Sequence, residues 1–219
     1  MSRSSVVFAA IALLGLSTTT GCHARFKRHA GTLGSVNTQV MVTGGPTVNV
    51  PTSSTGVGLI DNVANIGMAV GASTTAGKIR SAVDVGQMSG TLETSLGDAI
   101  GRGAPFTLAT DDGAGGLLEI DIRDFGVDAS TGVPDFRFQG VVKIYRSSDG
   151  WRVYRNGFRC SSRSGSYNAG GMVGIGQSAG GLLQLSEMED GDIRKAFDQQ
   201  AEVCGQYLVM EMRKHAGRQ

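Results

Sequence analysis

Histidine, cysteine, aromatic residues and charge are all scarce in this chain of 219 residues. Three histidines are present, and each lies near an end of the chain: His23, His29 and His215. Catalysis by a Ser-His-Asp or Cys-His arrangement needs a histidine that a rigid element presents beside its nucleophile. The sequence therefore predicts no triad-type catalysis, and we expect that the protein is not an enzyme.

Charged residues make up only 18% of the chain and nearly balance, with a net charge of +1. A nucleic-acid-binding surface needs an excess of Lys and Arg, so we expect no nucleic-acid partner. Aromatic residues account for 6%, whereas glycine supplies 34 residues, which indicates long loops or close backbone packing. The apolar fraction of 40% still suffices for a hydrophobic core.

The longest apolar run lies directly behind the first methionine and is short. Arg3 precedes it, it extends from Val6 to Leu16, and small or polar residues follow up to Gly21. A membrane-spanning helix needs about 20 apolar residues, which excludes this run. A short positive region, a short apolar run and small residues are typical of an export signal. We therefore predict that residues 1–21 form a signal peptide.

The last residues of this segment, Thr19-Thr20-Gly21-Cys22, resemble the lipobox of bacterial lipoproteins. In that family a small residue precedes the cysteine, a peptidase cuts between the two, and the thiol carries diacylglycerol. The resemblance implies lipidation of Cys22 and attachment to a membrane through it. Thr19 departs from the family pattern, which usually has Leu, and a secreted protein without lipid is the alternative. In Gram-negative members of that family, an Asp directly after the lipidated cysteine tends to retain the protein in the inner membrane. His23 stands at that position here, so the resemblance implies delivery to the outer membrane.

The cysteine count agrees with export. The chain has three cysteines, Cys22, Cys160 and Cys204. If Cys22 carries lipid, an even pair remains in an oxidising compartment, and we predict a Cys160–Cys204 disulfide. By the chain-entropy argument such a bridge, closing a loop of about 45 residues, would contribute about 4 kcal/mol. Two buried free thiols are the alternative.

A basic cluster, HARFKRH at 23–29, follows the lipobox. We predict that residues 22–35 form a basic tether between the lipid and the folded domain. Beside a membrane, its cations would gain about 1 kcal/mol each from anionic headgroups. A tether surrounded by water is the alternative.

Residues 36–219 are predicted to form a single α+β domain. Two short strands are expected within 36–50, separated by a turn at Gly44-Gly45-Pro46. Helical spacing of apolar residues predicts a weakly amphipathic helix over 58–71 and a clearer helix over 84–101. Asp84 is placed to cap the second helix.

Alternating apolar and polar residues predict the strands that follow. Leu118, Ile120 and Ile122 share one face, and a slip in this alternation predicts a bulge or bend near Asp124. Residues 136–144 and 151–160 read as a hairpin closed by SSDG.

A strong helical pattern over about 189–214 is preceded by Ser186 and Glu189, which resemble a capping box. Residues 161–185 are rich in glycine and serine, which predicts a flexible loop. The fold class expected is α+β, with an antiparallel meander sheet, helices packed on one of its faces and Gly-rich loops.

Several motifs resemble ligand sites without completing them. GASTTAGKI at 71–79 has Ala76 and Ile79 where a phosphate-binding loop needs Gly and Ser or Thr. GIGQSAGG at 174–181 follows no clear strand of a βαβ unit. The acids at 111–112 and 187–192 lack calcium-loop spacing, and Glu119 and Asp121 read as solvated charges on a strand. We expect no metal, no cofactor and no catalytic residue.

The order of elements carries a second resemblance. From LETSLGDAIGRGAPFTLATDD through LLEIDIRDFGVDA and FRFQGVVKIYRSSDGWRVY to the final helix, the chain resembles envelope lipoproteins of Gram-negative bacteria. These include ABC-transport auxiliary, lipopolysaccharide-assembly and curli-secretion types. The resemblance implies a non-enzymatic adaptor or assembly factor with envelope protein partners. The alternative is a lipoprotein that binds a lipid or small ligand in a groove lined by Phe136, Phe138 and Trp151.

Overall fold

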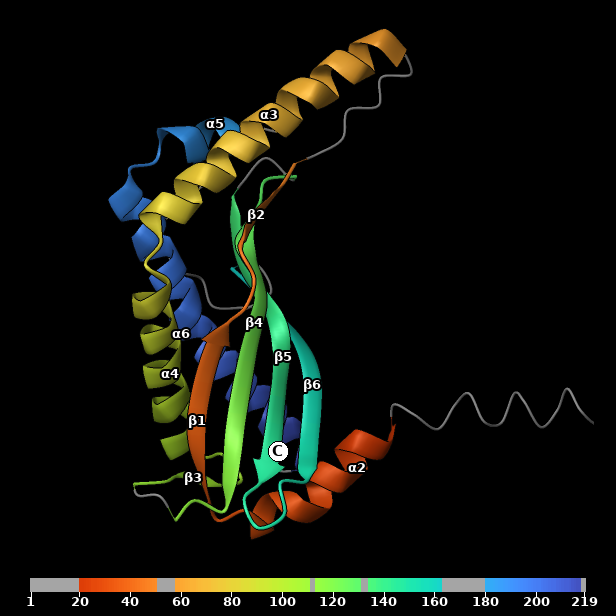
Figure 1. Cartoon of the computed structure of the whole chain (residues 1–219), viewed down its shortest axis with the longest axis vertical. Coiled ribbons are helices and arrows are strands. Elements are labelled where there is room, and N and C mark those ends of the chain that lie inside the picture. The colour runs from red at the N-terminus through yellow and green to blue at the C-terminus, as the bar shows by residue number, and fades with distance from the viewer. Residues whose placement is uncertain (1–19, 51–57, 111–112, 131–133, 163–179, 218–219) are drawn as a thin grey trace, which may run out of the picture.

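Helices cover one face of a twisted mixed sheet in the computed structural model of the chain (Figure 1). The structure describes residues 20–50, 58–110, 113–130, 134–162 and 180–217. The elements in chain order are α2 (Thr20–His29), the 3-10 turn η1 (Ala30–Thr32), β1 (Ser35–Val42), β2 (Pro46–Asn49), α3 (Gly58–Ala82), α4 (Val85–Gly101), β3 (Thr107–Leu108), β4 (Gly116–Asp128), β5 (Asp135–Arg146), β6 (Arg152–Ser161), α5 (Gly180–Glu187) and α6 (Asp190–His215).

The sheet has the order β3-β1-β4-β5-β6, and β2 also pairs with β4. The strands β4, β5 and β6 form the antiparallel meander that the sequence predicts. The expectation of a wholly antiparallel sheet is wrong, because β1 and β2 both run parallel to β4. The helices α3 and α4 lie between β2 and β4 in the chain, and a helical crossover returns the next strand in the same direction. The fold class is therefore α+β with a mixed sheet.

The predicted irregularity in β4 is confirmed and coincides with the break between β1 and β2. The pairing of β4 with β5 shifts register between Ile122 and Asp124. Opposite this bulge, the backbone N–H groups of Thr43 and Gly44 both donate to the Ile122 carbonyl oxygen, at 2.9 and 3.3 Å. A Cβ atom on Gly44 would lie 1.6 Å from the Arg123 carbonyl oxygen, so only glycine fits there.

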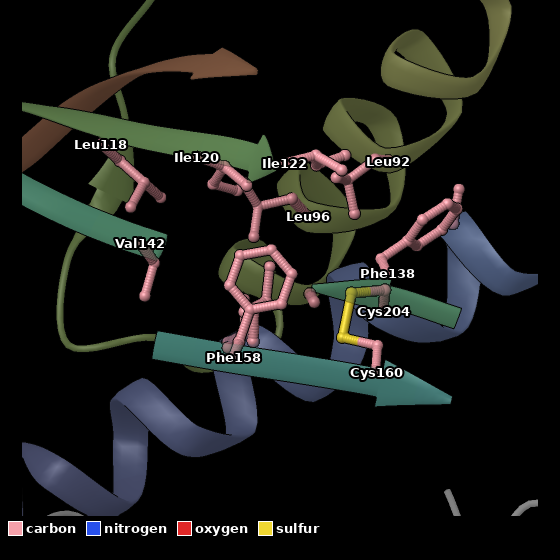
Figure 2. Close-up of a cluster of buried hydrophobic side chains, with 14 of the residues drawn as sticks. Leu92, Leu96, Leu118, Ile120, Ile122, Phe138, Val142, Phe158, Cys160 and Cys204 are labelled. Carbon is pink, nitrogen blue, oxygen red and sulfur yellow. A yellow bond between two sulfur atoms is a disulfide. The ribbon is translucent and has the colours of Figure 1, made fainter. Parts of the chain in front are cut away.

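The core lies between the sheet and the helices α4 and α6. Leu118, Ile120 and Ile122 are fully buried on β4, as the alternation predicts, and belong to the same cluster as Leu92 and Leu96 of α4 (Figure 2). On α6, the ring of Phe197 is fully buried among three other phenylalanine rings. Its centroid lies 5.7 Å from that of Phe125, 5.1 Å from that of Phe136 and 6.0 Å from that of Phe138.

The predicted cap of α4 is confirmed, whereas that of α6 is wrong. The Asp84 carboxylate accepts a hydrogen bond from the Gln87 backbone N–H at 3.0 Å. Glu189 is the N-cap residue of α6 but forms no side-chain cap, and the Ser186 hydroxyl donates to the Leu183 carbonyl at 2.7 Å rather than to α6. That bond lies within α5, a helix that occupies residues 180–185 of the segment predicted to be a Gly-rich loop, so the loop prediction is wrong there.

The helix α3 is longer than predicted and includes the whole 71–79 motif, so this segment forms no phosphate-binding loop. Lys78 donates from Nζ to the Ser186 carbonyl at 2.8 Å and also to the Met188 carbonyl, which joins the end of α5 to α3. The first half of α3 extends beyond the sheet at the end opposite α2 (Figure 1). Within the described ranges, no helix is both long and apolar enough to cross a membrane.

The predicted disulfide is present and joins Cys160 at the end of β6 to Cys204 in the middle of α6 (Figure 2). The two Cα atoms lie 5.5 Å apart across a sequence separation of 44 residues. Both residues are buried in the hydrophobic core. The bridge therefore ties the closing helix to a strand of the meander.

Candidate functional site at the N-terminal end

The segment 22–35, predicted as a tether, is part of the folded domain. The helix α2 packs against β6, and the Phe26 ring is fully buried with its centroid 4.4 Å from that of Tyr154. Ala30 and Leu33 are almost completely buried in the same hydrophobic core. Ala30 lies four residues after Phe26 and Leu33 three residues after Ala30, which is the spacing of residues on one helical face. The domain therefore begins within α2 rather than at residue 36.

The hairpin between β5 and β6 presents the single tryptophan of the chain beside α2. Trp151 is 41% exposed. The Asp149 carboxylate accepts bonds from Arg146 Nε at 3.0 Å and from the Trp151 backbone N–H at 3.1 Å. The Arg146 hydrogen bond, with help from the Trp151 N–H, lowers the pKa of Asp149 to about 2. Because the carboxylate bonds both to Arg146 and to the Trp151 backbone, it holds together the turn that carries the indole.

Two arginines and a histidine surround this indole. The guanidinium carbons of Arg25 and Arg146 each lie 5.5 Å from the centroid of the Trp151 ring, within the range of a cation–π contact. The His29 ring meets the same indole edge-on, at 5.6 Å between centroids. We call Trp151, Arg25, His29 and Arg146 the anchor-end cluster.

The helix α2 adds positive charge that no described residue neutralises. Its sequence contains no acid, and Arg25, Lys27 and Arg28 are exposed. None of the three forms an ion pair with any residue in the part of the chain that the structure describes. Cys22 belongs to the same helix, three residues before Arg25. The residue predicted to carry lipid is therefore adjacent to a cationic and aromatic surface.

The prediction that His215 lies at a frayed terminus is wrong. Its Nδ1 atom lies 2.7 Å from the Tyr154 hydroxyl, and its Nε2 atom lies 3.8 Å from a Glu211 carboxylate oxygen. Burial raises the pKa of Tyr154 above its usual value, and the charge of Glu211 adds to the shift. The phenol therefore stays protonated. These contacts hold the end of α6 beside Phe26 and β6.

The three residues predicted to line a ligand groove do not meet. Phe136 and Phe138 are 5% and 0% exposed and contact Phe197 in the core. Trp151 lies beyond the other end of β5, where Tyr145 pairs with Arg152. Nine residues of strand separate Phe136 from Tyr145, about 30 Å at the usual rise. The prediction of a shared groove is therefore wrong.

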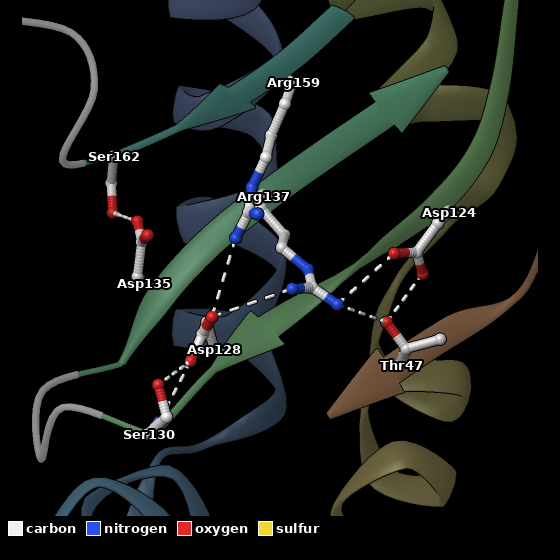
Figure 3. A network of polar contacts seen from close by, with 8 residues as sticks. All are labelled: Thr47, Asp124, Asp128, Ser130, Asp135, Arg137, Arg159 and Ser162. Carbon is white, nitrogen blue, oxygen red and sulfur yellow. Dashed lines mark hydrogen bonds and ion pairs between the residues drawn. The ribbon is translucent and has the colours of Figure 1, made fainter. Parts of the chain in front are cut away.

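The sheet face turned away from α2, α4 and α6 is polar, and we call it the open face. Its exposed members include Gln39, Gln139 and Arg155. At one end of this face, the Arg137 side chain is only 7% exposed and forms ion pairs with Asp124 at 3.3 Å and Asp128 at 3.7 Å (Figure 3).

Carboxylates along β4 pair with residues of the neighbouring strands. The Asp121 carboxylate accepts from the Thr43 hydroxyl at 2.6 Å and from Arg123 Nε at 2.9 Å. The Thr43 bond lowers the pKa of Asp121 more than burial raises it, and Arg123 lowers it further. Glu119 pairs with Lys143, which raises the pKa of that lysine. Both acids are therefore partly buried and paired, rather than solvated as predicted.

The described residues contain no group of three His, Cys, Asp or Glu side chains placed to hold a metal ion. The acids at 111–112, most of the 174–181 motif and residues 1–19 of the predicted signal peptide lie outside these residues. In Cys22 the structure describes the backbone alone. The structure thus brings an aromatic and cationic cluster close to Cys22, the residue predicted to carry lipid.

Comparisons with known proteins give little further information. No family model matches the chain, and no curated protein matches it. A crystal structure of a DUF330 protein from Xanthomonas campestris is similar with 18% identity and a TM-score of 0.37, over 60% of this chain. The match spans 66% of that protein. A likeness at this level assigns neither a family nor a function.

Proposed function

We propose that this protein is an exported lipoprotein of a Gram-negative envelope, held at the outer membrane by lipid on Cys22. The observation that carries the proposal is the Cys160–Cys204 bridge, which uses two of the three cysteines. Disulfides persist mainly in oxidising compartments, which favours export. Cys22 is then the cysteine left over, directly after a signal-like run and at the position where a lipobox carries its acylated residue.

We further propose that the protein acts without catalysis, as an adaptor or assembly factor for other envelope proteins. The open face supports this role because it carries exposed polar side chains over β1, β5 and β6, as in Gln39, Gln139 and Arg155. Charges of both signs lie on it, which suits a polar protein partner. The helices α4 and α6 cover the other face, so strand residues are accessible on one side of the sheet.

Lipid attachment is tested by comparing wild-type protein with Cys22→Ala in fractionated cells. We expect the wild-type protein in the outer-membrane fraction, with a mature N-terminal peptide that begins at acylated Cys22 by mass spectrometry. We expect the variant to keep its signal segment or to leave that fraction. If both proteins fractionate alike and no acylated peptide is found, the lipoprotein proposal fails.

The adaptor role is tested by photo-crosslinking in cells. A photoreactive residue at Gln139 probes the open face, and the matched position Gln199 probes the exposed side of α6. We expect Gln139 to give one or a few discrete crosslinked envelope proteins, identified by mass spectrometry, and Gln199 to give none of them. Absence of crosslinks at Gln139, or the same products at both positions, would contradict a partner on the open face.

A further inference from the structure

We infer that the anchor-end cluster, together with Lys27 and Arg28, is a membrane-docking surface that binds anionic phospholipid headgroups. The inference rests on the proposed lipid attachment at Cys22 and adds that the domain itself binds the membrane surface. The domain would lie against the membrane in one orientation, instead of moving freely at the end of a flexible tether.

The first support is the short, rigid path from Cys22 to the cluster. Three residues of helix separate Cys22 from Arg25, a rise of about 4.5 Å. The headgroup region on each side of a bilayer is roughly 5–7 Å thick. Phe26 follows immediately and is buried against Tyr154, so no loop separates the attachment residue from the core. Lipid on Cys22 would therefore hold Arg25 at the headgroups.

The second support is the chemistry of the surface. Tryptophan is enriched at membrane–water interfaces, where its ring contacts the apolar boundary and its N–H contacts the polar layer. Trp151 is exposed at the tip of its hairpin, with Arg25 placed over the ring. A partly exposed indole flanked by cations is suited to a layer that combines apolar and anionic groups.

The third support is the distribution of charge. Arg146 is paired with Asp149, whereas Arg25, Lys27 and Arg28 have no acidic partner among the described residues. Each basic residue near an anionic surface raises membrane affinity roughly fivefold. The unpaired cations lie on the helix that carries the proposed attachment residue, so the nearest anionic surface is the membrane itself. An acidic protein partner explains the charge equally well but not its position beside Cys22.

The orientation follows from the arrangement of the fold. The helix α2 and the β5–β6 hairpin lie at one end of the molecule, and the first half of α3 projects at the other (Figure 1). Docking through the anchor-end cluster would therefore direct α3 away from the membrane. The open face would then point sideways, parallel to the membrane surface rather than into it, and would be accessible to partner proteins.

The experiment uses the exported protein as isolated from cells, whose mass first shows whether Cys22 is acylated. Trp151 is the only tryptophan, so its fluorescence reports this surface alone. The protein is combined with phosphatidylglycerol or phosphatidylcholine vesicles that carry brominated acyl chains. In phosphatidylglycerol vesicles we expect a blue shift, protection from acrylamide and quenching by bromine. In phosphatidylcholine vesicles we expect clearly smaller effects, because acyl chains on Cys22 would bring the protein to the vesicle but no anionic headgroup would bind the cluster.

The variant Arg25→Glu should lose the protection in phosphatidylglycerol vesicles, because reversing one charge weakens binding roughly 25-fold. Arg28→Glu, which leaves the contacts of Trp151 intact, should show a similar loss. Lys195→Glu is the matched control, because it reverses an exposed charge near the start of α6, about 30 Å of helix from His215. It should behave as wild type.

The possible failures are distinguishable. If Cys22 is acylated but Trp151 responds equally to both vesicle types, or to neither, the docking inference is overturned and the lipoprotein proposal stands. If Cys22 carries no lipid and the same anionic vesicles still protect Trp151, the surface is supported and the lipoprotein proposal fails. Equal losses in Arg25→Glu and Lys195→Glu would show a non-specific charge effect and overturn the inference.

Discussion

The two faces of the sheet are built from alternate residues of the same strands, yet different forces hold them. On the face covered by helices, Ile120 of β4 and Phe138 of β5 are fully buried in the core. On the open face, their near neighbours Asp121 and Arg137 are also buried but form ion pairs. The comparison shows that one set of strands provides both a hydrophobic core and a polar surface.

The two faces differ in how much free energy they contribute. Full burial of a large apolar side chain is worth about 1.5–3 kcal/mol. An exposed ion pair contributes about 0–1 kcal/mol, and a buried pair such as Arg137–Asp124 stabilises little, since desolvation offsets its attraction. We therefore expect the face covered by helices to contribute most of the free energy of unfolding. The open face is then available for partner binding, provided that its charges stay paired.

The largest expected effect comes from Phe197, where the covered face meets α6. The variant Phe197→Ala removes a ring packed against three other phenylalanine rings. Loss of burial and the cavity left behind should lower the free energy of unfolding by about 3–5 kcal/mol. Urea denaturation followed by circular dichroism measures the change.

The matched substitution on the open face is Gln139→Ala, since Gln139 is exposed on β5. A surface change of this kind should shift the free energy of unfolding by less than about 0.5 kcal/mol. A comparable loss in both variants would contradict the assignment of stability to the covered face.

The next largest effect is expected for the bridge between the covered face and α6. The double variant Cys160→Ser, Cys204→Ser opens a loop closed across 44 residues. Its unfolded state regains chain entropy, so the free energy of unfolding should fall by about 2–4 kcal/mol. Thermal and urea unfolding measure the change, with Cys22→Ser as the control that leaves the bridge intact. No loss in the double variant would mean that the bridge does not constrain the unfolded chain.

The covered face could be predicted from the sequence, because burial follows local alternation. The alternation places Leu118, Ile120 and Ile122 on one face, and the bulge near Asp124 appears where this alternation slips. The parallel pairing of β1 and β2 with β4 could not be predicted in this way. Sheet order depends on contacts between distant segments, and the period of apolar residues carries no information about it.

The candidate site was predicted only in part. The basic residues of α2 stood out in the sequence, but the single Phe26 among them gave no sign that the helix is anchored in the core. From the sequence, Trp151 is predicted to line a ligand groove with two phenylalanine residues of β5, whereas the structure places it beside α2. Its neighbours Arg25 and His29 lie more than a hundred positions away in the chain. Such a cluster is visible only once the fold brings the hairpin to α2.

The smallest expected effect is a pH-dependent change in stability that arises from Asp121 on the open face and has no counterpart on the covered face. The Thr43 hydrogen bond, and then Arg123, hold the pKa of Asp121 below its usual value despite burial. A carboxylate with a lowered folded-state pKa stabilises the protein fully above its unfolded pKa of about 3.9. That contribution declines as the pH falls through the folded pKa, because protonation removes the negative charge of Asp121 that its hydrogen bonds and Arg123 stabilise.

The variant Asp121→Asn should therefore be less stable than wild type near neutral pH, and the difference should shrink as the pH falls below about 4. Thr43→Val should show the same convergence, since it removes the main cause of the pKa shift. Urea unfolding between neutral and acidic pH measures both variants. The destabilisation by Phe197→Ala should stay constant over that range, because no ionisable group takes part in the contact. If the difference in free energy of unfolding between Asp121→Asn and wild type does not change with pH, the Asp121 side chain stabilises the fold through packing and neutral hydrogen bonds rather than through its charge. The open face would then differ from the covered face in composition but not in the force that holds it.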